Sequence, residues 1–107
     1  MLIAVDVCLG ARGAAILRDA GHSVIEARHG ESDREWTGRA LGAGVELFVS
    51  GDSDVEIIAY DADVRFIRTR EGERGVALAI RVLESVGTAE PGDDEAVRCA
   101  EGRGGRT

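Results

Sequence analysis

Two kinds of stretch alternate along the chain, short apolar runs and longer amphipathic segments. The short runs are rich in Val, Ile, Leu and Phe and predict β-strands at residues 2–7, 23–27, 45–50 and 64–68. The amphipathic segments carry apolar residues on one side and predict helices at residues 11–20, 32 to about 42 or 44, 53–60 and 75–86. Strands and helices therefore alternate, with about 20 residues from one strand to the next, near the minimum for a βαβ unit.

This alternation with short connections predicts an α/β fold. We expect three layers, α/β/α, with helices on both faces of a four-stranded, mostly parallel sheet. The predicted domain spans residues 1–87. Residues 88–107 are rich in Gly, Asp, Glu and Arg, include the only proline, Pro91, and lack a sustained apolar period, so a flexible tail is expected there. No internal repeat beyond the alternation is apparent from the sequence.

Helix-start signals refine two of these elements. Ser32 followed by Glu35 has the spacing of a capping box, which predicts a helix beginning after Ser32. Ser53 is the candidate cap of the next helix. His22 precedes a strand at its N-terminal edge and is expected to be structural. Trp36 is expected to be a core residue or a contact in a homodimer.

Composition limits the chemistry. Arg supplies all 13 basic residues and the net charge is −7, so an RNA substrate requires metal ions and local arginines to offset the repulsion. The absence of lysine excludes Schiff-base chemistry and a Walker phosphate loop. Cys8 and Cys99 lack zinc-site spacing. A signal-peptide core and a membrane span are not expected, which predicts a cytoplasmic protein without a membrane partner.

Carboxylates follow the first and third predicted strands. Asp6 ends the first strand, while Asp52 and Asp54 follow the third, and Asp33 follows the second at the start of a helix. Ligands of open parallel sheets bind beyond the carboxyl ends of the strands, so these acids are expected to converge. Close carboxylates share protons or bind a cation, and Mg²⁺ and Mn²⁺ prefer such oxygen ligands. The sequence therefore predicts a divalent-metal site suited to phosphodiester hydrolysis.

Each of these acids also has an ordinary structural interpretation. An Asp after a strand is often a turn former or a helix cap, and this alternative stays open for Asp6. Of Asp52 and Asp54, one is expected to be a cap, and Asp52 is favoured as the functional residue because it lies nearer the strand end. Asp33 is favoured as a residue that complements the helix dipole rather than as a metal ligand. The candidate phosphate-binding residues are Arg12, Arg68 and Arg70.

In order and spacing, these motifs resemble those of the short PIN-like domains, relatives of the PIN ribonucleases of toxin–antitoxin systems. Residues 6–12 match the opening D-E-N-L-P-x-R in Asp, Leu and Arg, and residues 20–24 match the segment aGHdV. Residues 32–36 match sDeei, and residues 50–54 match T-x-D-x-D. The likeness covers about residues 1–86.

The resemblance implies a Mg²⁺- or Mn²⁺-dependent ribonuclease, with an antitoxin protein and a second copy of the chain as further partners. It places catalysis and metal binding on Asp6, Asp52 and Asp54, with Asp33 joining as a ligand. The opening motif departs from the family pattern, because Val7 and Cys8 replace its Glu and Asn. A degenerate, non-catalytic PIN-like binding module is therefore the competing hypothesis. A receiver-type phosphoacceptor domain is disfavoured, since receivers need a second acid after the first strand and a late lysine.

Overall fold

The computed structural model describes residues 1–6 and 9–87. Four parallel strands form one sheet in the order β2-β1-β3-β4. The strands are β1 (Leu2–Val5), β2 (Ser23–Glu26), β3 (Leu47–Ser50) and β4 (Arg65–Arg68). The helices are α1 (Gly10–Asp19), α2 (Asp33–Gly42), α3 (Ser53–Asp61) and α4 (Gly75–Val86). The predicted α/β fold with a four-stranded parallel sheet is confirmed; the predicted tail, residues 88–107, lies outside the described residues.

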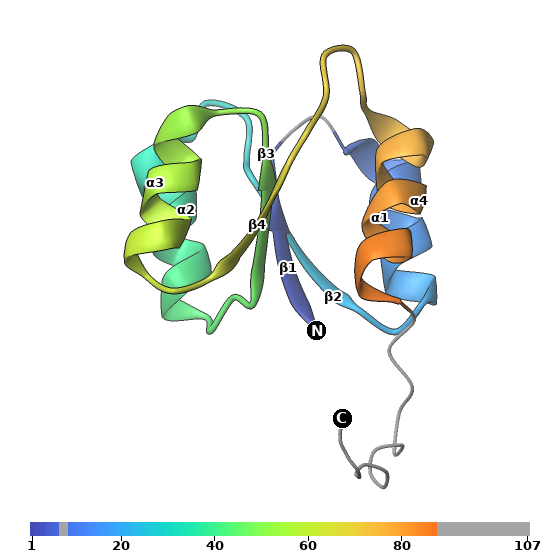
Figure 1. The fold of residues 1–107 in the computed structure, drawn as a ribbon, viewed down its shortest axis with the longest axis horizontal. Coiled ribbons are helices and arrows are strands. Elements are labelled where there is room, and N and C mark those ends of the chain that lie inside the picture. Colours follow the sequence, from blue (N-terminus) through green and yellow to red (C-terminus); the bar gives the residue numbers. More distant parts are fainter. Residues whose placement is uncertain (7–8, 88–107) are drawn as a thin grey trace, which may run out of the picture.

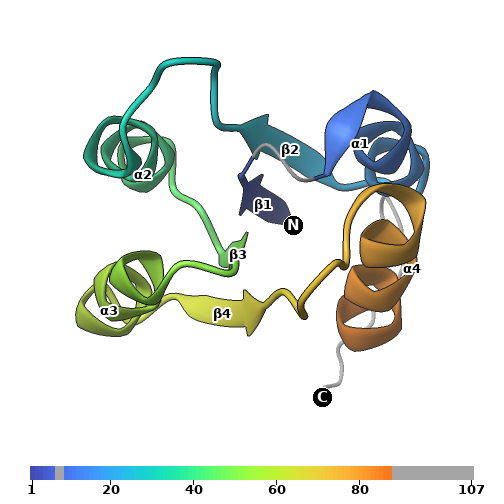
Figure 2. The ribbon, with the colours of Figure 1, turned by 90° about the horizontal axis from the view of Figure 1, so that it is seen from above.

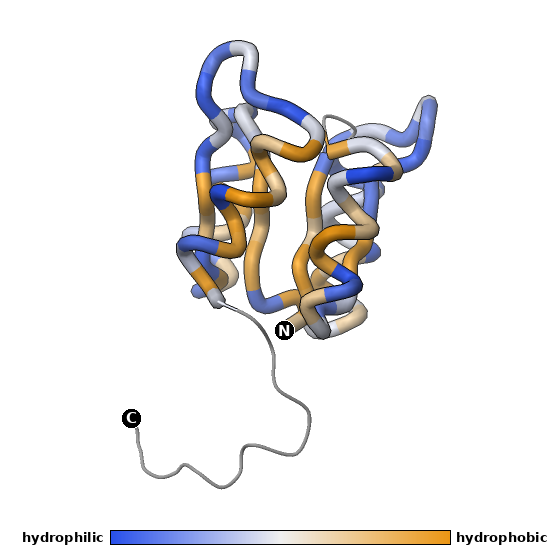
Figure 3. Tube along the Cα trace, turned by 90° about the vertical axis from the view of Figure 1, so that its right-hand side faces the viewer, coloured by the Kyte–Doolittle hydropathy of each residue, from blue (hydrophilic) through white to orange (hydrophobic). Residues whose placement is uncertain are grey.

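The helices form two layers, one on each face of the sheet (Figures 1 and 2). Helices α1 and α4 cover one face, and α2 and α3 cover the other. Polar residues gather in the loops beyond the strand ends, while apolar residues follow the strands and the inner sides of the helices (Figure 3). Three layers result because each face of the sheet is apolar and must be covered.

The two cores differ in composition. The core under α1 and α4 is aliphatic, with Leu9, Leu17 and Leu78 fully buried. The core under α2 and α3 contains the aromatic pair Trp36 and Phe48, whose ring centroids lie 5.7 Å apart in an edge-to-face arrangement. Such pairs contribute about 0.5–1.5 kcal/mol beyond their area burial. The predicted core role of Trp36 is confirmed, and its burial makes it unsuitable as a dimer contact.

Local signals explain most helix boundaries. The capping box of α2 forms as predicted: the Glu35 backbone N–H donates to Ser32 Oγ, and the Ser32 N–H donates to Glu35 Oε1. Ser53 as the cap of α3 is wrong, because Asp52 is the N-cap and Ser53 is the first helical residue, whereas the expectation that one of Asp52 and Asp54 is a cap is confirmed. Asp52 prevails because its Oδ1 accepts a hydrogen bond from the Asp54 backbone N–H at 2.8 Å.

His22 is structural, as expected. Its ring is buried behind the N-terminal edge of the sheet. Nε2 donates to the Gly87 carbonyl at 2.6 Å, and Nδ1 lies 3.3 Å from the Met1 amino group. The ring therefore fastens the end of α4 to the start of β1.

The segments α1-β2-α2 and α3-β4-α4 form an internal repeat, which the sequence pattern did not reveal. Strands β2 and β4 correspond at an offset of 42 residues, as do the starts of α2 and α4 and the ends of α1 and α3. The chain leaves α1 with Gly21 at φ +94 and leaves α3 with Asp63 at φ +58, and each backbone N–H bonds three residues back. The strand order is unchanged when the two halves are exchanged, so a pseudo-twofold relation interchanges the two faces.

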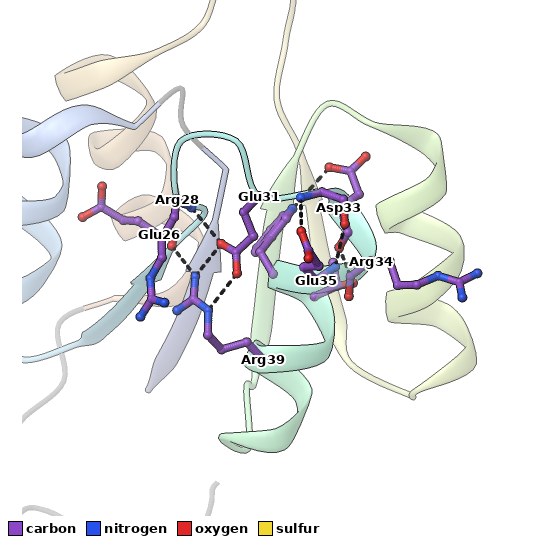
Figure 4. A network of polar contacts seen from close by, with 10 residues as sticks. Glu26, Arg28, Glu31, Asp33, Arg34, Glu35 and Arg39 are labelled. Carbon is purple, nitrogen blue, oxygen red and sulfur yellow. Dashed lines mark hydrogen bonds and ion pairs between the residues drawn. The ribbon is translucent and has the colours of Figure 1, made fainter.

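The clearest repeated feature is an ion pair in the loop that joins β2 to α2 (Figure 4). The Glu31 carboxylate accepts hydrogen bonds from the Arg39 guanidinium at 2.8 Å and from the Arg28 backbone N–H at 2.8 Å. Arg39 also donates to the Glu26 carbonyl, and Gly30 turns the loop at φ +81. The hydrogen bond from Arg39, together with that from Arg28, lowers the pKa of Glu31 to about 2.

The loop joining β4 to α4 repeats this arrangement 42 residues later. Glu73 accepts from the Arg81 guanidinium at 2.8 Å and from the Arg70 backbone N–H at 2.9 Å. Arg81 also donates to the Arg68 carbonyl, and Gly72 turns the loop at φ +76. The hydrogen bond from Arg81 is the main cause that lowers the pKa of Glu73 to about 2. Each half of the domain thus orders its strand-to-helix loop with the same Arg–Gly–Glu…Arg device.

Candidate functional site: an acidic edge of the sheet

The carboxyl ends of β1 and β3 lie side by side at the point where the strand order reverses. Asp6 directly follows β1, and its backbone N–H donates to the Val49 carbonyl of β3 at 3.4 Å. Asp52 follows β3 by two residues, and its backbone N–H donates to the buried Ser50 side chain at 3.0 Å. The strand register therefore brings both predicted acids to the edge at which open parallel sheets bind ligands.

The carboxyl groups of Asp33 and Asp52 lie close enough for each to shift the pKa of the other. The interaction with Asp52, together with partial desolvation and the charges of Asp52 and Asp54, raises the pKa of Asp33. The interaction with Asp33 and the hydrogen bond from the Asp54 backbone N–H lower the pKa of Asp52. Together the two groups hold one proton more readily than two separate aspartates do.

Asp33 is held in place by the helix that it begins. The buried Trp36 indole lies one turn further along α2, and its Nε1 donates to Asp33 Oδ1 at 3.3 Å. The Thr37 hydroxyl donates to the Asp33 carbonyl oxygen at 2.5 Å. Figure 4 shows Asp33 at the start of α2 beside the residues of the capping box. Asp33 is thus a central member of the acidic edge, whereas the sequence favoured it only as a residue that complements the helix dipole.

Asp6 and Asp54 flank this pair on opposite sides. Asp6 lines a hollow of about 260 Å³ together with Asp33, Trp36 and the exposed His29. Asp54 lines a second hollow of about 490 Å³ between α2 and α3. We name this second hollow the α2–α3 groove; it is lined by Asp33, Arg34, Thr37, Gly38, Leu41, Asp54 and Ile58.

Across residues 1–6 and 9–87, no three His, Cys, Asp or Glu side chains lie close enough together to form a ready-made metal site. The acidic edge is therefore a two-carboxylate contact, Asp33 with Asp52, flanked by two further acids. Mg²⁺ commonly binds to proteins through one or two carboxylates and keeps several waters, so a pair fits its donor requirement.

The three predicted phosphate-binding arginines are spread over the domain. Arg68 is paired with Glu56, donates to the Gly51 carbonyl at 2.9 Å, and lowers the pKa of Asp52 through its charge. Arg70 lines a hollow of about 640 Å³ together with Arg74, between the starts of α1 and α4. Arg12 is exposed on the first turn of α1.

The internal repeat places residues of different charge at equivalent positions. Asp33 corresponds to Gly75 and Asp54 corresponds to Arg12, each pair separated by 42 residues. The first turns of α2 and α3 contain acids, whereas those of α1 and α4 contain none. The helix starts on the α2–α3 face are therefore acidic, and the equivalent helix starts on the α1–α4 face are neutral to basic.

Sequence reasoning missed the contact between Asp33 and Asp52. A signal for it was present, because the capping box fixes the first turn of α2 and places Trp36 three residues after Asp33, on the same side of the helix. The position of Cys8 and Val7, which bears on the opening motif, lies outside the described residues.

Comparisons with known proteins found no matching family model, no similar curated protein and no similar solved structure. Within the part of the chain that the structure describes, every helix is too short or too polar to cross a membrane.

Proposed function

We propose that the acidic edge binds a divalent cation and that the chain is a PIN-like, metal-dependent ribonuclease. The contact between the Asp33 and Asp52 carboxyl groups carries the proposal. Two neighbouring carboxylates repel each other unless a proton or a cation lies between them. A structural role alone does not account for the contact, because Ser32 already caps α2 and Asp52 satisfies its capping role through the Asp54 backbone.

The donor set suits Mg²⁺ or Mn²⁺. Asp33 and Asp52 would hold the ion, and Asp6 and Asp54 would bind its water ligands from either side. A bound ion would supply Lewis-acid stabilisation of negative charge on a phosphodiester. Arg68 is fixed by Glu56 and by the Gly51 carbonyl, so its role would be to set the charge around Asp52 rather than to grip the substrate.

Substrate phosphates would be held further along the same edge. Arg70 and Arg74 line a hollow at the starts of α1 and α4, where backbone N–H groups without side-chain caps also favour anions. An RNA strand laid across the carboxyl edge would therefore meet carboxylates on one side of the β1–β3 junction and arginines on the other. This arrangement offsets the −7 net charge of the chain locally.

The competing proposal is a PIN-like module that binds the cation without catalysis. It is favoured by the finding that, among the described residues, no third carboxylate lies close enough to complete a ready-made site. Replacement of the family's Glu and Asn by Val7 and Cys8 points in the same direction. An antitoxin protein is the partner that the PIN-like ribonuclease proposal implies.

The first experiment tests metal binding through Trp36, the only tryptophan, whose indole contacts Asp33. We expect Mn²⁺ and Mg²⁺ to change its fluorescence in the wild type. Asp33→Asn and Asp52→Asn should weaken the response at least about tenfold. Asp19→Asn removes the same charge at the far end of α1 and should respond like the wild type. Equal responses in all four proteins would overturn the metal site.

The second experiment measures cleavage of single-stranded RNA with Mn²⁺ present. We expect the wild type and Asp19→Asn to cleave, and we expect Asp52→Asn to lose roughly 100-fold or more in rate. Asn also serves as a helix cap, so this variant keeps α3 intact. Metal binding without cleavage would establish the non-catalytic alternative instead.

A further inference from the structure

The α2–α3 groove is lined by a glycine in the middle of a helix. A Cβ at Gly38 would meet no atom within 4 Å, and no left-handed backbone requires glycine there. Glycine inside a helix costs about 1 kcal/mol relative to alanine. Neither packing nor backbone conformation in the described structure explains why glycine stands at this position. A need to keep the groove open would explain it.

The internal repeat shows what the groove lacks. The counterpart of Gly38 is Ile80 of α4, and the counterpart of Thr37 is the buried Ala79. On that face α1 and α4 are in close contact, since a Cβ at Gly13 would lie 2.9 Å from the Gly75 carbonyl oxygen. The α2–α3 face has the buried Val55 in place of Gly13, and its two helices are in less extensive contact than α1 and α4.

The groove and helix α3 together present apolar and acidic residues. Leu41 and Ile58 form apolar walls of the groove, and Ile57 and Tyr60 on α3 are 59% and 84% exposed. Helix α3 carries three acidic residues and no basic one. The groove itself ends at Asp33 and Asp54, where both helices begin, and Arg34 is its one basic residue.

We propose that the α2–α3 groove is a docking site for a protein segment that is both apolar and basic. Its apolar side chains would pack on Leu41 and Ile58, over the space at Gly38. A Lys or Arg of the segment would reach Asp33 and Asp54 at the acidic end. Charge complementarity selects this occupant: a second copy of this acidic chain would bring its own negative charge to an acidic rim. The proposal does not depend on nuclease activity.

The groove can be filled without disturbing the fold. Gly38→Gln places a good helix former where the structure leaves room, so the variant should fold and be at least as stable as the wild type. Gly42→Gln is the matched control, because Gly42 also has open space around it and lies on α2 but does not line the groove. Neither substitution changes the net charge.

The probes are two synthetic amphipathic helical peptides of about two to three turns, with the same Leu face and either Lys or Glu on the polar face. Fluorescence anisotropy of the labelled peptides, with EDTA present, reports binding. We expect the Lys peptide to bind the wild type and Gly42→Gln alike and Gly38→Gln at least tenfold more weakly. The Glu peptide should not bind.

Equal binding of the Lys peptide to Gly38→Gln would overturn the proposal, because charge attraction alone would then explain it. Failure of the Lys peptide to bind the wild type, or equal binding of the Glu peptide, would also overturn it. Sedimentation velocity on the free proteins tests the other occupant. A wild-type dimer that Gly38→Gln abolishes would assign the groove to a second copy of the chain.

Discussion

The two faces of the sheet are counterparts in the internal repeat, yet they differ in how their helices pack and in how those helices begin. On one face, α1 approaches α4 so closely at Gly13 that an added Cβ would lie 2.9 Å from a backbone oxygen. On the other, α2 and α3 leave a groove of about 490 Å³ at Gly38. The closed face has an aliphatic core, and its helices begin without acids or side-chain caps. The open face has an aromatic pair, two side-chain caps and the contact between Asp33 and Asp52.

In our proposal, this difference would separate the part of the small domain that stabilises the fold from the part that binds the cation. Both faces are built from the same strand–helix unit, so the backbone supplies equivalent positions at the carboxyl edge. The polar and open features are concentrated in one of the two, where Asp33 and Asp54 stand in place of Gly75 and Arg12. The closed face can then hold the fold while the open face tolerates repulsive acids and an unfilled groove.

The largest expected contrast between the faces comes from one substitution made on each. Gly13→Ala should destabilise the protein by about 1–3 kcal/mol, because its Cβ meets the Gly75 carbonyl and the Leu9 side chain at under 3 Å. Gly38→Ala should stabilise it by up to about 1 kcal/mol, since its Cβ meets nothing and alanine favours the helix. Urea denaturation followed by circular dichroism gives both values.

Gly42→Ala serves as the control for the glycine pair, because its Cβ is also free of contacts. The same sign of effect at positions 13 and 38 would show that the two faces do not differ in packing as described.

A smaller contrast is expected between equivalent helix starts. Ser32→Ala should cost about 1 kcal/mol, because it removes the hydroxyl that accepts from the Glu35 backbone N–H. Arg74→Ala, at the corresponding N-cap of α4, should change the stability by less than about 0.5 kcal/mol, since no side-chain cap bond is lost. Equal losses in thermal denaturation of the two variants would contradict this assignment of caps.

Asp33→Asn should stabilise the metal-free protein slightly, by less than about 1 kcal/mol, because the site is exposed to screening. The folded-state pKa of Asp33 is raised, so its contribution to stability is present below the unfolded pKa and is lost as pH rises through the folded one. The variant should therefore be more stable than the wild type at pH 7 and equal to it near pH 3. If the stability gained by the variant over the wild type were larger at pH 3 than at pH 7, the Asp33 carboxylate would not be destabilised by its acidic neighbours.

The order of elements, the parallel sheet and the limits of α4 followed from the sequence because each depends on local pattern. Residues 75–86 are apolar on one side and helical as predicted, and Ser32 with Glu35 formed the expected capping box. Asp52 rather than Ser53 caps α3, a choice between two good caps that depends on where β3 turns. The proximity of Asp33 and Asp52 could not be predicted from the sequence, since it depends on how α2 packs against the edge of β3.

The internal repeat escaped sequence inspection for a physical reason. Core positions accept any side chain that fills the space, so Trp36 in one half corresponds to Leu78 in the other. Few residues are identical at equivalent positions of the two halves, and the informative ones are polar, such as Glu31 with Glu73 and Arg39 with Arg81. Their shared role is seen only in the hydrogen bonds that they form in the structure. We expect these two ion pairs to contribute similar stability on the two faces.

Arg39→Gln and Arg81→Gln should therefore lower the melting temperature at pH 7 by similar amounts, since each leaves a glutamate without its guanidinium partner. The pKa values of Glu31 and Glu73 are both lowered to about 2, so each pair contributes stability above the unfolded value near 4.5 that is lost as pH falls toward 2. Melting curves at pH 7, 4 and 2.5 should show each variant approaching the wild type as the pH falls. A large loss in only one variant, or a constant gap at every pH, would show that the repeated loops are alike in geometry but not in energy.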